Sequence, residues 1–204
     1  APMDKTAVLL MAYGTPRCSD EILSYYTDIR RGRPPNAEQL ADLVARYQAI
    51  GGVSPLATRT ESQLDAIASE LGVIAPDKFH VQLGLKHAHP TIEETVTDLS
   101  EQGFSRIIAL VLAPHYSSYS VGQYLSRATE AAATLGMTVT GINSWAVEPA
   151  FVSFIANDLR HKLSAMSSAS RHPLVVFTAH SLPERIIDSG DPYQIELRST
   201  ARAV

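Results

Sequence analysis

The stretch Thr6-Ala7-Val8-Leu9-Leu10-Met11 decides the fold that the sequence predicts. It is almost continuously apolar, which is typical of a strand covered on both faces in a parallel sheet. Four later runs share this character. The five predicted strands are Thr6–Met11, His80–Leu85, Arg106–Leu112, Thr138–Ile142 and Leu174–Thr178.

Helical patterns separate these strands. Two of them open with the spacing of a capping box, at Asn36 and at Thr91, each directly after a proline. Further helices are expected over Ser19–Arg30, Thr60–Leu71, Ser120–Leu135, Pro149–Ala165 and from Tyr193 onward, with helix ends at Gly72, Gly103 and Gly136 and a polar surface loop over Ser164–Ser170. This alternation predicts an α/β fold, a doubly wound parallel sheet with helices on both faces.

The composition is that of an ordinary globular chain. Of its 204 residues, 45% are apolar and 19% are charged, which suits one large domain over 1–204. The 17 basic and 21 acidic residues give a net charge of −4, which argues against a nucleic-acid partner. Because Cys18 is the only cysteine, neither an internal disulfide nor a cysteine-held iron–sulfur cluster is expected.

Membrane insertion and export have no support in the sequence. The longest apolar run, Ala7–Ala12, is far too short to cross a bilayer. Its flanks also lack the charged start and the cleavage site of a signal peptide. We therefore expect a cytoplasmic protein with no transmembrane segment.

Histidines and aromatic residues follow the predicted strands at their carboxyl ends, where open α/β sheets bind ligands. They are Tyr13, His87, His89, His115, Tyr116, Tyr119, Trp145 and His180. A single histidine at such a place is more often a turn residue bonded to the backbone. Several of them beside aromatic rings suit a flat conjugated ligand that also needs proton transfer or metal coordination.

Other ligand classes find little support. The sequence has no glycine-rich dinucleotide or nucleotide motif after a strand, and no G-x-S-x-G nucleophile turn. His87 and His89 have the spacing of a metal-binding pair, but a third ligand is not defined. The loop Gly51–Pro55 suits a backbone segment near a ligand and suits a plain turn between helices equally well.

Several longer stretches resemble the ferrochelatase family. The most specific runs from Val175 through Thr178-Ala179-His180-Ser181-Leu182-Pro183 to Gly190-Asp191-Pro192-Tyr193. Others, in the same order as in that family, are Met11–Pro16, Ile29–Arg33, Gly51–Leu56, Gly84–His87 and Leu112–Ser117. The likeness covers essentially the whole chain and is greatest to the Gram-positive bacterial branch, whose members are soluble and act on coproporphyrin III.

The resemblance implies insertion of ferrous iron into a porphyrin, a lyase reaction of haem biosynthesis. His180 matches the active-site histidine of the family, which would accept pyrrole protons and contact the metal. Tyr13 matches the residue that faces the metal from the other side of the ring in this branch. Both are therefore candidate catalytic and metal-contacting residues, iron is a substrate, and no tightly bound cofactor is implied.

Further residues are candidates for holding the porphyrin. Ile29, Tyr116, Tyr119 and Trp145 are expected to form apolar walls that bend the macrocycle. Arg30, Arg31, Ser54 and Tyr124 suit its propionates, although Arg30 and Arg31 also suit a solvated helix end. His87 belongs to the same set through its matching stretch.

The family also implies more than this chain contains. Its members typically carry a second α/β half of similar size, with a glutamate that faces the active-site histidine. No position before Val204 matches that glutamate. We therefore expect an amino-terminal portion of such an enzyme, with poor activity by itself and monomeric when complete.

Three alternatives remain open on the sequence. A single-domain chelatase that loads sirohydrochlorin with cobalt or nickel shares the superfamily. A tetrapyrrole-binding or metal-binding module without catalysis would keep the same cleft. A generic α/β domain would use its strand-end histidines structurally.

Overall fold

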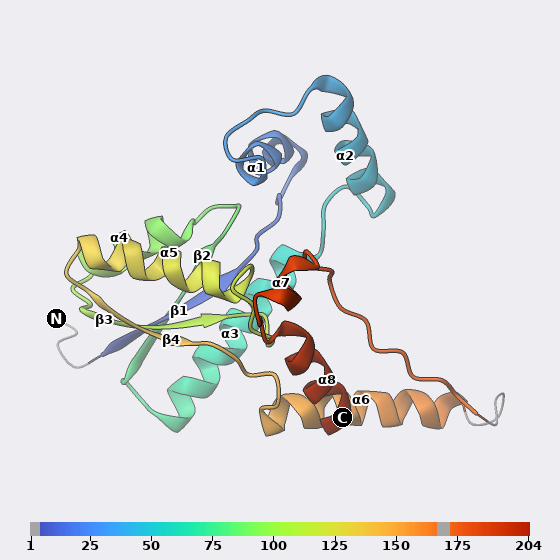
Figure 1. The fold of residues 1–204 in the computed structure, drawn as a ribbon. Helices are drawn as coiled ribbons and strands as arrows, with labels where there is room; N and C mark the ends of the chain where they lie inside the picture. The colour runs from blue at the N-terminus through green and yellow to red at the C-terminus, as the bar shows by residue number, and fades with distance from the viewer. Residues whose placement is uncertain (1–4, 167–171) are drawn as a thin grey trace. The chain divides into compact units, whose positions relative to one another are not determined.

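A computed structural model describes residues 5–166 and 172–204 (Figure 1). In chain order the elements are β1 (Thr6–Ala12), the 3-10 turn η1 (Ser19–Glu21), α1 (Ile22–Ile29), α2 (Ala37–Ala49), α3 (Leu56–Ile74), β2 (Phe79–Leu85), α4 (Ile92–Glu101), β3 (Arg106–Val111), α5 (Val121–Thr134), β4 (Thr138–Ile142), α6 (Pro149–Met166), α7 (Arg185–Asp188) and α8 (Tyr193–Ala203).

The chain divides into two compact units. The first holds the described residues up to Leu112 together with Tyr124–Gly141. The second holds Ala113–Gln123 and the described residues from Ile142 onward. That residues 1–204 form one chelatase-like domain stays a prediction.

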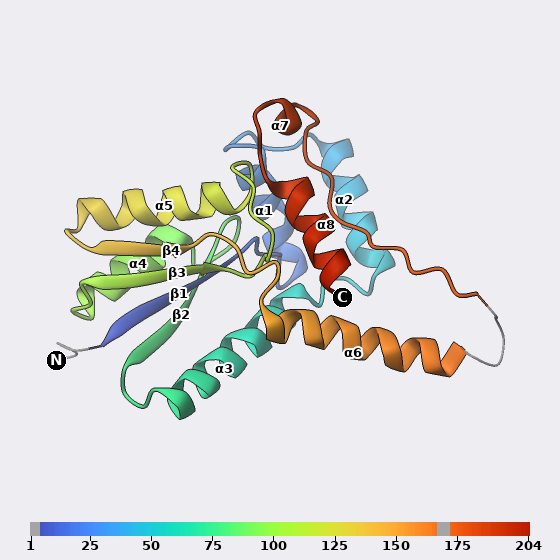
Figure 2. The same cartoon turned by 60° about the horizontal axis from the view of Figure 1, so that its bottom comes forward.

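The predicted α/β architecture is confirmed in the sheet. Its four strands are ordered β2-β1-β3-β4, and β1 pairs in parallel with both β2 and β3. Figures 1 and 2 show α4 and α5 on one face of the sheet and α3 on the other. Four of the five predicted strands therefore form, each within a residue or so of its expected bounds.

The central strand β1 is covered on both faces, as its unbroken apolar sequence predicts. On one face Val8 and Leu10 join Leu83 in a core on which α3 packs. On the other face Leu9 is fully buried, and Gly84 lets α4 approach closely. A Cβ atom at Gly84 would lie 3.0 Å from Leu9 Cδ1 and 3.1 Å from Ile92 Cα.

Both predicted capping boxes are present. The Asn36 side chain accepts a bond from the Gln39 N–H, and the Gln39 side chain accepts one from the Asn36 N–H. Thr91 and Glu94 make the same reciprocal pair at the start of α4. Gly103 and Gly136 follow helices with positive φ as expected, whereas α3 continues past Gly72 to Ile74.

Replacing Thr91 with alanine should lower the free energy of unfolding by about 1 kcal/mol, because the Glu94 N–H loses its side-chain acceptor. Urea unfolding followed by circular dichroism measures the loss. Thr97→Ala, at an exposed position of the same helix, should be neutral or slightly stabilising. Equal destabilisation by both changes would mean that the cap is not responsible.

The fifth predicted strand, Leu174–Thr178, is wrong. The segment belongs to the second unit, has no strand assignment, and exposes 87% of Leu174 and 68% of Val176. An apolar β-branched run is a strand only where another strand offers hydrogen bonds, and this run has no such pairing within the described residues. The prediction that His180 follows a strand of this sheet is therefore wrong as well. Of the predicted loop Ser164–Ser170, residues 164–166 end α6 and the rest lie outside the described residues.

Candidate active site

Tyr13 and His87 lie side by side because the ladder between β1 and β2 continues past the ends of both strands. Beyond the Ala12–Leu85 pair, Lys86 N donates to Ala12 O at 2.9 Å and His87 N donates to Tyr13 O at 3.0 Å. The two rings meet edge to face with their centroids 4.6 Å apart. The pairing of β1 with β2 thus places these two candidate residues next to each other.

Gly14 makes the close approach of these two loops possible. Its φ is +87°, in the left-handed region that favours glycine, and a Cβ atom there would lie 2.8 Å from Ala88 Cβ. Any larger residue at position 14 would push the Tyr13 loop away from the His87 loop.

Asp28, at the end of α1, holds the other side of the His87 ring. His87 Nδ1 lies 2.6 Å from the Asp28 carboxylate, and only 15% of the His87 side chain is exposed. Burial lowers the pKa of His87 below its usual value, although the bond to Asp28 acts in the opposite direction. The lowered pKa favours the neutral form of the imidazole at pH 7.

Tyr13 also lines an open pocket of about 400 Å³ in the first unit. Its walls are Tyr13, Gly14, Thr15, Tyr25, Leu43, Arg46, Tyr47, Ile50, Ser54 and Leu56. Burial raises the pKa of Tyr13, and Tyr47 and Asp28 add to the shift. Burial also raises the pKa of Tyr25, so these phenols keep their protons at neutral pH.

Two of the ten residues that line the pocket, Tyr13 and Ser54, are site residues predicted from the sequence. The lining also includes Tyr25, Arg46 and Tyr47, which the sequence did not single out. Tyr25, Arg46 and Tyr47 lie on α1 and α2, and Thr15 Oγ1 is 3.4 Å from the Tyr47 hydroxyl. A mixed polar and aromatic lining of this kind suits a flat ligand that carries acidic groups.

The predicted residues at the end of α1 do not line this pocket. The Arg30 guanidinium lies 5.6 Å from the centre of the Tyr26 ring, and its Nε donates to the Arg33 carbonyl. Arg31 is exposed and has a φ of +57°, while Ile29 is partly buried. Arg30 and Arg31 thus end the helix, and contact with a ligand stays a prediction for all three.

Tyr124 is almost fully buried, with 5% exposure, and burial raises the pKa of its phenol. The Lys86 ammonium lies 5.1 Å from the centre of its ring. Arg127 fixes the backbone here, since it donates to the Lys86 carbonyl at 2.8 Å and makes two bonds of 2.7 Å to Glu93. The sequence did not predict that Arg127 holds the loop that carries His87.

The histidine pair at positions 87 and 89 does not form a metal site. His87 bonds to Asp28, whereas the exposed His89 bonds to Glu94 at 2.9 Å. Among the described residues, no group of three or more histidine, cysteine, aspartate or glutamate side chains is arranged to hold a metal ion.

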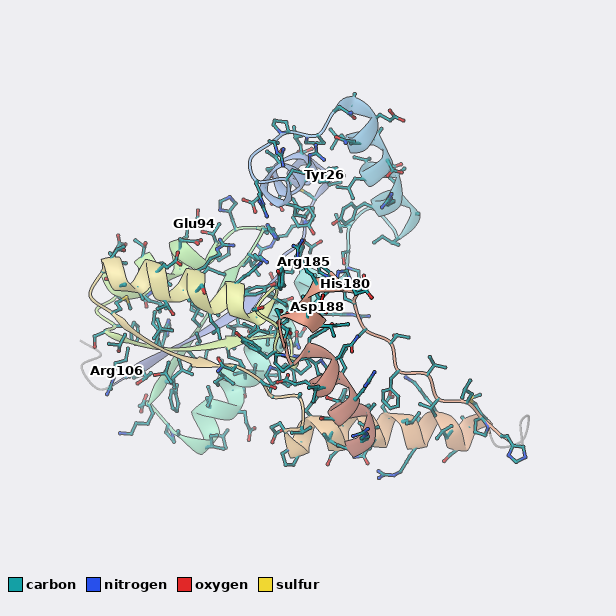
Figure 3. The ribbon with its side chains drawn as sticks, in the orientation of Figure 1. Tyr26, Glu94, Arg106, His180, Arg185 and Asp188 are labelled. Carbon is teal, nitrogen blue, oxygen red and sulfur yellow. The ribbon has the colours of Figure 1, made fainter. Side chains whose placement is uncertain are left out.

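In the second unit, His180 precedes α7 and its side chain is exposed (Figure 3). The Tyr193 hydroxyl donates to its backbone carbonyl at 3.0 Å. The Tyr193 ring meets His115 edge to face at 6.4 Å, and His115 Nε2 lies 2.8 Å from Thr200 Oγ1. A chain of contacts from α8 therefore fixes the backbone that carries His180.

The segment 113–123 in the same unit is bonded to residues near the C-terminal end of the chain. Glu196 accepts bonds from Tyr116 N at 2.5 Å and from Ser144 Oγ at 2.9 Å. Arg185 donates to the Tyr119 hydroxyl at 3.2 Å and lies 5.2 Å above its ring. Trp145 packs edge to face on Phe151 at 4.8 Å. Tyr116, Tyr119 and Trp145 thus have defined structural partners, and their contact with a porphyrin stays a prediction.

A known protein family matches nearly the whole chain. The family model described as ferrochelatase matches residues 5–204. The chain belongs to the ferrochelatase family. The resemblance seen in the sequence is thereby confirmed, and the sirohydrochlorin alternative is not favoured.

Relatives within the ferrochelatase family include three bacterial proteins. The chain is 48% identical over 200 residues to coproporphyrin III ferrochelatase 1 of Bacillus cereus (strain ATCC 10987 / NRS 248), with 97% of the chain and 64% of the relative covered. It is 43% identical over 202 residues to the coproporphyrin III ferrochelatase of Oceanobacillus iheyensis, and 44% identical over 203 residues to that of Bacillus pumilus. Each of these two alignments covers 98% of the chain and 65% of the relative. The chain thus spans about two thirds of the length of these ferrochelatases.

Among the described helices of this ferrochelatase-family chain, none has the length and apolar character needed to cross a membrane.

Proposed function

We propose that the protein inserts ferrous iron into coproporphyrin III. The observation that carries this proposal is the Tyr13 phenol on the wall of a 400 Å³ pocket, in edge contact with a neutral imidazole. An uncharged phenol and an uncharged imidazole each carry a lone pair that can face an incoming cation. The choice of coproporphyrin III as the substrate rests on the names of the Bacillus and Oceanobacillus relatives.

The reaction removes two pyrrole protons as one ferrous ion enters the ring. In our proposal His180 accepts these protons, because an exposed imidazole can pass them on to solvent. Tyr13 contacts the metal from the other face of the ring, with its phenol still protonated. Iron is thus a substrate, and each proton leaves through a named side chain.

The acidic side chains of the porphyrin need hydroxyl or cationic partners. Ser54, on the pocket wall, suits one such group, and Arg30, Arg31 and Tyr124 stay candidates for the others. Ile29, His87, Tyr116, Tyr119 and Trp145 remain proposed contacts of the macrocycle. We also propose that the complete protein works as a monomer in the cytoplasm.

Titration of the complete protein with two tetrapyrroles tests the proposal. We expect coproporphyrin III to bind and to take up ferrous iron anaerobically, followed by the loss of metal-free porphyrin fluorescence. Sirohydrochlorin with cobalt should react poorly. A preference for sirohydrochlorin would overturn the proposal, and binding of coproporphyrin III without metal uptake would favour a non-catalytic binding module.

A further inference from the structure

The contact between Asp28 and His87 joins two segments 59 residues apart, α1 and the loop after β2. The His87 side chain is 15% exposed and that of Asp28 is 58% exposed, so the imidazole is held inside while the carboxylate faces water. The separation of 2.6 Å is that of a short hydrogen bond to a charged acceptor. The contact is therefore directional and not merely a meeting of opposite charges.

This bond determines which nitrogen of His87 carries hydrogen. A carboxylate only accepts hydrogen bonds, so the atom that faces it, Nδ1, must be the donor. In a neutral imidazole the other nitrogen, Nε2, then bears a lone pair and can only accept. A histidine without such a partner favours the opposite arrangement, with hydrogen on Nε2. Asp28 thus holds His87 in the less common tautomer.

The same bond restrains the ring that supports Tyr13. The His87 backbone N–H is bonded to the Tyr13 carbonyl, and the His87 ring meets the Tyr13 ring at an interplanar angle of 63°. With its Nδ1 bound to Asp28, the imidazole cannot rotate without losing both contacts. A partner of this kind commonly fixes the tautomer and the plane of a functional histidine.

We propose that Asp28 is a positioning residue of the tetrapyrrole site, which holds His87 as an Nε2 hydrogen-bond acceptor and keeps its ring against Tyr13. The inference rests on the proposed function, since the acceptor serves a bound ring that presents N–H or acid O–H groups. Asp28 itself touches neither porphyrin nor iron in this proposal, and it acts only through His87.

Nitrogen NMR of the complete protein with 15N-labelled histidine tests the tautomer directly. The His87 signals are assigned by their loss in His87→Gln. We expect hydrogen on Nδ1 in the native protein and in Asp28→Asn, whose amide oxygen still accepts. In Asp28→Ala the hydrogen should move to Nε2. Asp65→Ala, which removes an exposed carboxylate from α3, should leave the His87 signals unchanged.

Binding of coproporphyrin III supplies the second measurement. In Asp28→Ala the His87 Nε2 atom no longer accepts a hydrogen bond, so binding of coproporphyrin III should weaken by about fivefold to tenfold. In Asp28→Asn binding should weaken by less than about twofold. An unchanged tautomer in Asp28→Ala, or equal weakening by both variants, would overturn the role of Asp28. If the native protein shows the Nδ1–H tautomer and yet binds no coproporphyrin III, the proposed function fails while the tautomer assignment stands.

Discussion

Replacing His180 with alanine is expected to slow iron insertion into coproporphyrin III by about 100-fold or more. A positioned general base contributes roughly 10²–10⁴-fold to a proton transfer, and the reaction must release two pyrrole protons. The His180 side chain is exposed, so its truncation removes no core packing. Its backbone carbonyl keeps the bond from Tyr193, which leaves the local chain path unchanged.

Anaerobic single-turnover assays on the complete protein measure this effect, with porphyrin binding measured separately. The rate should fall, while the dissociation constant for coproporphyrin III changes little. His161→Ala, at an exposed position of α6, is the matched control and should leave the rate unchanged. A His180→Ala protein that inserts iron at the native rate would remove His180 from the mechanism.

The sheet could be predicted because each of its strands has a local apolar pattern that is typical of a buried strand. The run from Thr6 to Met11 is apolar on both faces, and the structure buries both faces of β1 between α3 and the helix pair α4 and α5. The two capping boxes could be predicted for the same reason, because each depends only on a polar residue and a partner three positions later. Patterns of this kind require no knowledge of the rest of the chain.

Leu174–Thr178 shows where such evidence ends. Its composition is as strand-like as that of β1, yet it is exposed and has no strand pairing in the described residues. Pairing is a property of two segments, and one segment cannot reveal whether its partner is present. The predicted position of His180 depends on this strand, so it cannot be more certain than the strand itself.

The residues of the site that directly follow strands could be predicted from the sequence. The residues that reach the site from helices could not. Tyr13 and His87 follow paired strands, so strand ends alone bring them together. Asp28, Tyr25 and Tyr47 lie on α1 and α2, and their contacts depend on how these helices pack. A single sequence does not contain that information.

Replacing Asp191 with alanine is expected to lower the free energy of unfolding by about 3 kcal/mol, because four hydrogen bonds to its carboxylate are lost. One carboxylate oxygen accepts bonds from Ser117 Oγ at 3.0 Å and from Ser118 N and Oγ at 2.8 and 2.9 Å, and the other accepts from Tyr193 N at 3.0 Å. Ser117 is fully buried, so loss of the carboxylate leaves its hydroxyl without its acceptor. This aspartate thus ties the segment 113–123 to the start of α8.

The same bonds make the contribution of Asp191 depend on pH. Burial favours its neutral form, but the hydrogen bonds from Ser118, Tyr193 and Ser117 outweigh burial and lower its pKa below the ordinary 3.8. A carboxyl group with a lowered pKa stabilises the fold fully above its unfolded value and loses that contribution as the pH falls through the folded value. The stability difference between the native protein and Asp191→Ala should therefore be constant from pH 7 to pH 5 and shrink below about pH 4.

Chemical denaturation of both proteins across this pH range measures the difference. Asp188→Ala, an exposed carboxylate three residues earlier on α7, is the matched control and should change stability little at any pH (Figure 3). Asp191→Asn keeps one acceptor oxygen and cannot ionise, so its stability should lie between those of the native protein and the alanine variant. If the loss in Asp191→Ala persisted undiminished at pH 2, the cause would be packing rather than the charge on Asp191.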